Sequence, residues 1–351
     1  MSSQVSEEVV LKALSRVIDP DLHRDIVSLG MVKNLRLEDG EVWFDYELTT
    51  PACPLKEKMR SMAEEALHGV PGLKAFHINM TARVRAAIGL PQREPIPGVA
   101  NVIAVGAGKG GVGKSTVSAN LAVALGMLGA KVGLMDADVY GPNMPIMMGV
   151  DEPPVLTDDK KMVPLESHGV KVMSMGFLLD PEQPVIWRGP MLHSAMTNFV
   201  RDVVWGELDY LVVDLPPGTG DISLSLSQLV PISGAVVVTT PQEVSLSDVA
   251  KAVTMFRKLQ VPVLGVVENM SYFVCPHCNQ RTEIFDHGGG RRLSQEMDIP
   301  FLAEIPIHAG VRQAGDSGMP VVKRSPGSMQ AEAFMELARN LAQQVSMAAM
   351  R

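Results

Sequence analysis

The run GKGGVGKST at residues 108–116 constrains the fold of this 351-residue chain more than any other feature. It fits the pattern G-x-x-x-x-G-K-[ST], which is meaningful only where a strand leads into it and a helix follows it. Both neighbours are present, because the apolar stretch NVIAVGA precedes the run and a helical stretch comes after it. The run therefore predicts a phosphate-binding loop at the end of a strand.

The residue types of this loop have distinct expected roles. Glycines let backbone N–H groups converge on phosphate oxygens, and the dipole of the following helix favours negative charge. Lys114 is expected to reach the outer phosphates and Ser115 to ligate Mg²⁺. A glycine-rich turn without a ligand is the alternative. We expect ATP and Mg²⁺ here, with the nucleotide held by Gly108, Lys109, Gly110, Gly111, Val112, Gly113, Lys114, Ser115 and Thr116.

Acidic residues end two further strand-like runs. The run LDYLVVDLPPG contains Asp214, which is expected to hold Mg²⁺ through water. The run KVGLMDAD ends with Asp136 and Asp138. Because ligands of open α/β sheets collect at the carboxyl ends of strands, these acids are predicted to belong to the nucleotide site. Capping of a helix N-terminus is the alternative role for Asp136 and Asp138.

Short apolar runs alternate with helical stretches from Asn101 onward. Runs that are apolar on both sides and joined by helices predict a parallel sheet covered on both faces. The expected class is therefore α/β, a nucleotide-binding domain with a mostly parallel, doubly wound sheet over residues 101–351. The runs are NVIAVGA, KVGLMDAD, VKVMSMGF, YLVVDL, GAVVVTT, VPVLGVVENM and FLAEIPI.

A small α+β domain is expected to precede this sheet, over residues 1–85. Apolar spacing predicts a helix over residues 5–18. Asp39-Gly40 lies between two strand-like runs and is a strong signal for a hairpin, and a helix near Pro54 then leads to a last strand. The order is α-β-β-α-β. Residues 86–100 are rich in proline and glycine, and they are the predicted linker.

Cys275 and Cys278 form a C-x-x-C pair, in which two thiolates can converge on one metal or cluster or form a redox disulfide. A structural zinc site needs four ligands, and His277 lies between the cysteines where it is poorly placed to join them. Two copies of the pair across a two-fold axis would supply the four thiolates that usually hold a [4Fe–4S] cluster. The favoured reading is a bridging cluster, with zinc and thiol–disulfide chemistry as alternatives.

The composition excludes several classes of function. A net charge of −8 without a cluster of basic residues argues against nucleic-acid binding. The acidic N-terminus is unlike a signal peptide, and no apolar run approaches the roughly 18 residues of a membrane span. The three cysteines are too few for a disulfide scaffold and are normal for a reducing compartment. We therefore expect a cytoplasmic protein without a membrane or nucleic-acid partner.

Lys109, directly after the first glycine of the loop, makes the chain similar to the deviant Walker ATPases, which include MinD, ParA, the nitrogenase iron protein and the Mrp/ApbC carriers. The resemblance implies a nucleotide-dependent homodimer in which Lys109 reaches the partner's nucleotide. It also implies that Asp138 positions the attacking water, with Lys109, Lys114 and Asp138 as the catalytic set. Asn269 matches an asparagine that reads adenine, and the loop after FLAEIPI closes over the base.

Over residues 101–325 the chain most resembles the Mrp/ApbC iron–sulfur cluster carriers. The shared motifs are DADVYGPN, WRGPM around Arg188, DLPPGTGD around Asp214 and Asp221, TTPQEVSLSDV and ENMSYFVCPHC. The resemblance implies ATP hydrolysis coupled to transfer of a labile [4Fe–4S] cluster from a homodimer to apo iron–sulfur proteins, with cluster scaffold proteins as further partners. Asn279 and Asp286 replace glycines common in relatives, and both residue types are tolerated in tight turns.

The first domain resembles the small iron–sulfur assembly domain of SufT-like and PaaD-like proteins. The stretches DPDLHRDIVSLGMV and TTPACPLKEKM carry this resemblance. Cys53 lies in the second stretch, and the resemblance makes it a candidate for transient contact with a metal or cluster. A lone cysteine before a helix is otherwise a small buried hydrophobic residue.

Two other classes of function remain as alternatives. A spatial organiser like MinD or ParA needs a basic amphipathic helix to bind a membrane, whereas the C-terminal stretch offers only a terminal arginine. A nitrogenase-like reductase holds its cluster with cysteines that are far apart in sequence, not in C-x-x-C.

Overall fold

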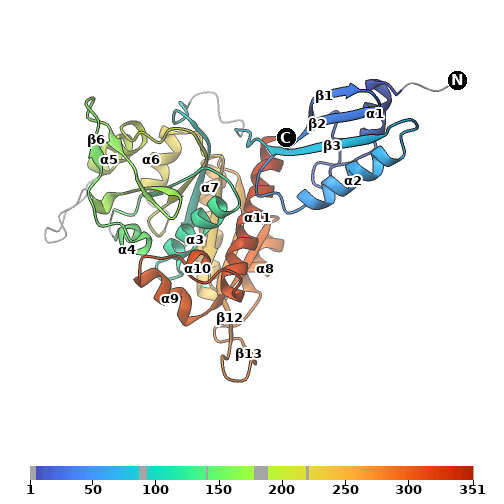
Figure 1. Ribbon diagram of the computed structural model, residues 1–351. Helices are drawn as coiled ribbons and strands as arrows, with labels where there is room; N and C mark the ends of the chain where they lie inside the picture. The colour runs from blue at the N-terminus through green and yellow to red at the C-terminus, as the bar shows by residue number, and fades with distance from the viewer. Residues whose placement is uncertain (1–4, 87–92, 140, 178–188, 219–220, 351) are drawn as a thin grey trace. The chain divides into compact units, whose positions relative to one another are not determined.

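The computed structural model describes residues 5–86, 93–139, 141–177, 189–218 and 221–350 (Figure 1). The chain divides into two units. The first comprises Met1–Arg85 with Ala342–Arg351, and the second comprises Ala86–Leu341.

The first unit is a three-stranded sheet with two helices. Strands β1 and β2 form an antiparallel hairpin around Asp39 and Gly40, whose positive φ angles of 49° and 82° allow the tight turn. β3 pairs parallel with β2, so the sheet order is β1-β2-β3. Alternate residues of β2 are buried, which gives this sheet one face toward the helices. The elements are α1 (Glu7–Leu14), β1 (Val32–Glu38), β2 (Glu41–Leu48), α2 (Lys56–His68) and β3 (Ala75–Ala82).

Helix α1 is shorter than the predicted range 5–18. It begins after Ser6, whose hydroxyl accepts the N–H of Val9, and it ends at Leu14. The chain then turns because the Asp19 carboxylate accepts the backbone N–H groups of Asp21 and Leu22. This local turn ends the helix even though the apolar spacing continues.

The second unit has a nine-stranded sheet among its described residues, in the order β13-β12-β11-β4-β10-β5-β9-β8, with β14 paired to β12. The pairs are parallel except β8 with β9 and β12 with β13. A mostly parallel sheet was predicted, and it is confirmed. The strands are β4 (Val99–Ala107), β5 (Val132–Asp136), β8 (Leu165–Ser167), β9 (Val170–Ser174), β10 (Leu208–Asp214), β11 (Gly234–Thr239), β12 (Val263–Val274), β13 (Arg281–Thr282) and β14 (Phe301–Ile307).

Helices cover both faces of this sheet, as the apolar strands require. α3 packs against β4, β5 and β10 on one face and contacts α4 and α10. Outside the sheet, β6 (Val155–Leu156) and β7 (Met162–Val163) form a separate pair. The helices are α3 (Lys114–Met127), α4 (Met144–Met148), α5 (Gly189–Arg201), α6 (Asp221–Leu229), α7 (Glu243–Lys258), α8 (Gly289–Glu296), α9 (Ala309–Asp316), α10 (Val321–Arg324) and α11 (Met329–Ala349), with a 3₁₀ turn at Met175–Phe177.

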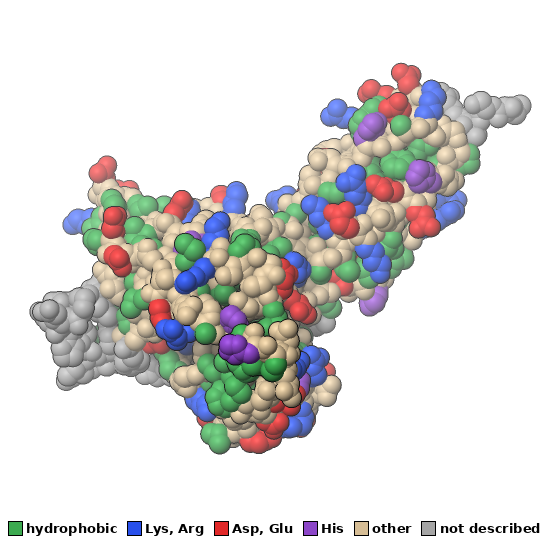
Figure 2. Space-filling model, turned by 60° about the horizontal axis from the view of Figure 1, so that its bottom comes forward, with side chains coloured by type: hydrophobic (Ala, Val, Ile, Leu, Met, Phe, Trp, Pro, Cys, Tyr) green, Lys and Arg blue, Asp and Glu red, His purple; other side chains and the backbone are tan. Residues whose placement is uncertain are grey.

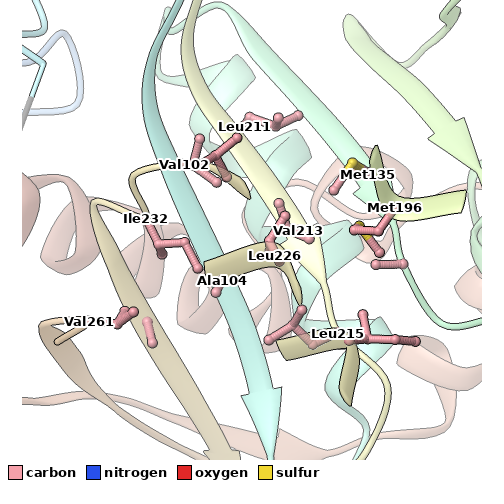
Figure 3. Packing of buried hydrophobic residues seen from close by; sticks show 14 of the residues in the cluster. Val102, Ala104, Met135, Met196, Leu211, Val213, Leu215, Leu226, Ile232 and Val261 are labelled. Carbon is pink, nitrogen blue, oxygen red and sulfur yellow. The ribbon is translucent and has the colours of Figure 1, made fainter. Parts of the chain in front are cut away.

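The hydrophobic core on the opposite face joins the sheet to α5, α6 and α7. Figure 3 shows Val102 and Ala104 of β4 beside Leu211 and Val213 of β10, with Leu226 of α6 packed against them. All five side chains are buried. Each such valine or leucine contributes about 1.5–3 kcal/mol through burial, so this packing fixes β4 and β10 relative to each other.

The strand order places the candidate site at one edge of the sheet. β4 lies between β10 and β11, and both pair with it in parallel. The strands therefore end at a common edge, where open α/β sheets bind their ligands. β4 begins at Val99, inside the range predicted for the linker, because Val99 already pairs with Leu208.

The helices and the surface charge bear on possible partners of the protein. None of the described helices is long and apolar enough to cross a bilayer. Figure 2 shows acidic and basic side chains interspersed over the described part of one face.

Candidate nucleotide site and cysteine hairpin

The loop between β4 and α3 depends on its glycines for close backbone contacts. Gly113 has a φ of 80°, and a Cβ there would lie 2.2 Å from the side-chain nitrogen of Asn269. A Cβ on Gly108 would lie 2.3 Å from the backbone carbon of Asp248. A larger residue at Gly108 would force the backbone of Asp248 to move, and a larger residue at Gly113 would be strained by the positive φ and would displace the Asn269 side chain. The loop is thus shaped for a close approach of backbone to ligand.

Three side chains of α3 converge on Asp214, at the carboxyl end of β10. Its Oδ2 accepts hydrogen bonds from Lys114 Nζ at 2.7 Å and Ser115 Oγ at 2.6 Å. Its Oδ1 accepts one from Ser118 Oγ at 2.6 Å. The carboxylate is only 1% exposed, so these donors offset its desolvation. Ser118 was not predicted, because a serine inside a helical stretch carries no signal of its own.

Asp136 and Asp138 have different surroundings, although Asp136 ends β5 and Asp138 follows two residues later. Asp136 is fully buried and accepts hydrogen bonds from the N–H groups of Asp138 and Met144 and from the hydroxyl of Ser174. Burial, with a further contribution from the charge of Asp214, raises the pKa of Asp136 to about 7. Asp136 therefore fixes the loop after β5, including the first turn of α4.

Asp138 points to the nucleotide pocket instead. Its Oδ2 lies 3.9 Å from Lys114 Nζ, and its Oδ1 accepts the N–H of Gly141 at 3.3 Å. Lys114 is consequently held between two carboxylates, those of Asp214 and Asp138. Of the two acids predicted at the end of β5, only Asp138 is among the described residues that line the pocket.

A pocket of about 650 Å³ lies over the loop. It brings together the loop residues from Lys109 to Thr116, Asp138 and Asn269, which come from separate parts of the sequence. The segment after β14 lines one side of the pocket; closure of this segment over the base stays a prediction from the family resemblance. Asn143 of the DADVYGPN motif also lines the pocket, and several lining residues belong to no predicted motif: Met147, His308, Arg312 and Asp316.

Asn269 contacts the phosphate loop directly. Its side-chain nitrogen donates a hydrogen bond to the Val112 carbonyl at 2.8 Å. Asn269 is 6% exposed and lines the pocket from the centre of β12. The structure therefore places this asparagine against the loop backbone.

The cysteine pair lies at the turn between β12 and β13. The N–H of Cys275 donates to the carbonyl of Gln280, and the N–H of Asn279 donates back to the Cys275 carbonyl. Asn279 has a φ of 56°, and Asp286 further along has 74°, so both residues that replace glycine adopt the left-handed conformation. Cys275 is half-buried, Cys278 is exposed, and both thiols are free.

Local donors favour the thiolate of Cys275. The N–H groups of His277 and Cys278 and the Cys278 thiol hydrogen-bond to Cys275, and these bonds lower the pKa of its thiol. A thiolate is the form that ligates metals. Across the described residues, no group of three or more His, Cys, Asp or Glu side chains is arranged to hold a metal ion. The hairpin by itself offers a pair of sulfur ligands.

Cys53 lies in the first unit, in the turn before α2. It is half-buried, and this burial raises the pKa of its thiol, with smaller contributions from the charges of Asp21 and Asp19. Its surroundings thus favour the protonated thiol. The predicted family motifs lie partly outside the described parts of the structure, at Tyr140, Trp187, Arg188, Thr219, Gly220 and the side chain of Asp221.

A glycine loop between a parallel strand and a helix, with Asp214 at its base, defines a P-loop NTPase. Comparison with family models gives a closer assignment. The model described as the NUBPL iron-transfer P-loop NTPase matches residues 98–342, and an iron-sulfur cluster assembly protein model matches residues 7–79. The chain belongs to the NUBPL iron-transfer P-loop NTPase family, which confirms the predicted resemblance.

Individual relatives agree with this assignment. An iron-sulfur cluster carrier protein of Deinococcus radiodurans is 51% identical over 340 residues, covering 97% of this chain and 95% of the relative. The iron-sulfur cluster transfer protein NUBPL of Mus musculus is 52% identical over 252 residues, covering 71% of this chain and 79% of the relative.

Solved structures are similar in fold. A nucleotide-binding protein from Archaeoglobus fulgidus, in complex with ADP, has a TM-score of 0.57 and 42% identity, covering 64% of this chain and 88% of that one. The cell division ATPase MinD of Pyrococcus furiosus has a TM-score of 0.53 and 26% identity, covering 68% and 97%. The predicted fold class, a P-loop NTPase with a mostly parallel sheet, is confirmed.

Proposed function

We propose that this protein is an iron–sulfur cluster carrier that binds and hydrolyses ATP. Its cargo is a [4Fe–4S] cluster held between two copies of the chain and passed to apo iron–sulfur proteins, with cluster scaffold proteins as the source. The observation that carries the proposal is the C-x-x-C hairpin, where Cys275 has a lowered pKa and Cys278 is exposed. The names of the relatives, a cluster carrier and a cluster transfer protein, support it.

The dimer follows from the number of ligands. A [4Fe–4S] cluster usually takes four thiolates, and one hairpin offers two. A two-fold axis beside the hairpin brings the second pair, because it places the same surface of each copy against the other. Lys109, which is partly exposed at the pocket, is proposed to reach the partner's nucleotide across the same axis.

The nucleotide site has the donor types that ATP with Mg²⁺ requires. Ser115 Oγ and the Asp214 carboxylate are oxygen ligands, which Mg²⁺ prefers, either directly or through water. Bound Mg²⁺ supplies charge neutralisation at the outer phosphates. Lys114 neutralises the same phosphates from the loop, and Asp138 orients the attacking water. Asp136 acts only by holding the loop that carries Asp138.

Anaerobic reconstitution with ferrous iron and sulfide tests the proposal. The wild type is expected to take up about four irons per two chains, with absorbance typical of a [4Fe–4S] cluster. Cys275→Ala and Cys278→Ala are each expected to lose this uptake, whereas Cys53→Ala, a matched control in the first unit, keeps it. Uptake of zinc in place of iron by the wild type, or full iron uptake by Cys275→Ala, would refute the cluster assignment.

A further inference from the structure

The cysteine turn belongs to a segment that leaves the sheet and returns to it. We call residues 271–288 the cysteine lobe; Figure 1 shows it as the hairpin of β12 and β13 that extends beyond the rest of the sheet. Inside the lobe, Phe273 pairs with Thr282, and the guanidinium of Arg281 lies 4.0 Å from the centre of the Tyr272 ring. These contacts join its outgoing and returning strands into one hairpin.

One buried carboxylate closes the base of the lobe. Glu268 is fully buried, and its Oε1 accepts hydrogen bonds from Ser271 Oγ at 2.6 Å and from the N–H of Gly288 at 3.0 Å. Its Oε2 accepts the N–H of Gly290 at 2.5 Å. Ser271 and Gly288 are the first and last residues of the lobe. Glu268 therefore holds both ends, and it also satisfies N–H groups at the start of α8.

The next residue of the strand holds the phosphate loop. Consecutive side chains of a strand point to opposite faces, so Asn269 points away from the base of the lobe. Its amide nitrogen donates to Val112 of the loop, and it touches Gly113 closely. Of these two adjacent residues of β12, Glu268 thus contacts the cysteine lobe and Asn269 contacts the phosphate loop.

The strand is irregular immediately after this point. Met270 has a φ of 56°, a conformation that costs energy for a residue with a side chain, and it lines the nucleotide pocket. The register of β12 against β14 also shifts between Asn269 and Phe273. The lobe is consequently joined to the sheet at a break in the ladder of hydrogen bonds, and Glu268 restrains it there.

We propose that Glu268 is a positioning residue for Cys275 and Cys278, and that the Glu268–Asn269 step transmits occupancy of the phosphate loop to the cysteine pair. When the loop residues turn their N–H groups toward phosphate, the Val112 carbonyl moves with them, and Asn269 follows. Because Glu268 directly precedes Asn269 in β12, it moves with Asn269 and shifts the base of the lobe. The inference deepens the proposed function, because it takes these cysteines as the cluster ligands.

Alkylation of the apo protein measures this link. Iodoacetamide is added with and without saturating ADP and Mg²⁺, and mass spectrometry follows the peptide that carries Cys275 and Cys278. The wild type is expected to change its alkylation rate by about fivefold or more on binding ADP, the size of a typical coupling between sites. In Glu268→Gln one oxygen becomes an amide nitrogen that faces a backbone N–H, that of Gly288 or that of Gly290. The restraint on the base of the lobe is therefore weakened, and the change is expected to fall below about twofold.

Two controls separate coupling from damage. Glu268 is not among the pocket-lining residues, so the Kd for ADP in Glu268→Gln is expected to stay within about twofold of the wild type. Glu283→Gln removes an exposed carboxylate from the same lobe and is expected to keep the full response. If circular dichroism shows that Glu268→Gln does not fold, Ser271→Ala replaces it as the test. This substitution removes one of the three hydrogen-bond donors to Glu268 and should give an alkylation response to ADP between those of the wild type and of an uncoupled protein.

Two outcomes would overturn the inference: wild-type cysteines that react equally with and without ADP, or a full response in Glu268→Gln or, where that fails to fold, in Ser271→Ala. The assay contains no iron. The alkylation result therefore does not depend on whether cluster reconstitution succeeds. The proposed function and this inference can each fail independently of the other.

Discussion

Two cysteines of this protein are each followed by proline, yet their surroundings differ. Cys53-Pro54 lies in the turn before α2, where burial raises the pKa of the thiol. Cys275-Pro276 lies at the end of β12, where N–H groups of the same turn lower the pKa of the thiol. The dipeptide alone therefore does not indicate a ligand. Desolvation of the sulfur and the N–H groups that hydrogen-bond to it decide whether the thiolate is favoured.

Burial is the main cause of the raised pKa at Cys53, where one backbone N–H, that of Leu55, acts in the opposite direction. Backbone N–H groups are the main cause of the lowered pKa at Cys275. At Cys53 the backbone hydrogen bonds of the turn join Thr50 to Cys53 and Cys53 to Lys56, and the turn leads into a helix. At Cys275 the hairpin closes through Gln280 and Asn279, which leaves the N–H groups of His277 and Cys278 directed at the sulfur. A hairpin turn thus prepares a ligand, while a turn into a helix buries the cysteine.

Under the proposed function the cysteine hairpin binds the cluster and the nucleotide loop does not. Lys114→Ala tests this separation and has the largest expected effect. The substitution removes the amine aimed at the outer phosphates and should lower ATP turnover by about 100-fold or more. Iron uptake in reconstitution is expected to stay at the wild-type level, since Cys275 and Cys278 lie outside the loop. Turnover near the wild-type value would contradict the assignment of Lys114.

The reactivity of the two cysteines tests the comparison directly. At neutral pH Cys275 is expected to react with iodoacetamide at least about tenfold faster than Cys53, because it is more often a thiolate. As pH falls, the reaction of Cys53 should stop first, since its pKa is raised and that of Cys275 is lowered. Peptide mass spectrometry of the apo protein gives both rates from one sample. If Cys53 and Cys275 reacted at equal rates at every pH, the proposed difference between their thiol pKa values would be wrong.

Under the proposed function a second copy of the chain is needed at the cysteine hairpin and, through Lys109, at the nucleotide site, but not at Cys53. If Lys109 acts across the dimer and Asp138 within its own chain, a mixture of Lys109→Ala and Asp138→Ala chains contains one working site per heterodimer. Random mixing should then restore about a quarter of the wild-type ATPase activity. Each variant alone should remain near background. The absence of recovery in verified heterodimers would count against the shared site.

The sequence predicted the parallel sheet, the loop and Asp214, because local patterns with fixed spacing specify them. The local pattern at the end of β5 did not separate the roles of Asp136 and Asp138, which only the family resemblance distinguished, because the two acids differ in what the fold packs around them. The contact of Asn269 with Val112 joins positions 157 residues apart, so no local pattern contains it. The opposite pKa shifts of Cys53 and Cys275 likewise depend on burial and on the direction of backbone N–H groups.

The smallest expected effect concerns Tyr46, beside Cys53 in the first unit. Tyr46 is fully buried, and its hydroxyl has no hydrogen-bond partner among the described residues. Burial raises the pKa of Tyr46, so the hydroxyl stays protonated. A buried hydroxyl without a partner costs stability, and Tyr46→Phe is therefore expected to raise the free energy of unfolding of the first unit by about 1 kcal/mol.

Hydrogen exchange of the β2 amides in the full chain measures this change. Tyr210→Phe, at a buried tyrosine of the second unit that does have an interaction partner, is the matched control and should give no gain. Cluster uptake should be unchanged in Tyr46→Phe, because the proposed cluster ligands are Cys275 and Cys278 and not Cys53. A loss of stability in Tyr46→Phe would mean that the hydroxyl has a stabilising partner. A loss of iron would mean that the first unit holds a ligand site near Cys53.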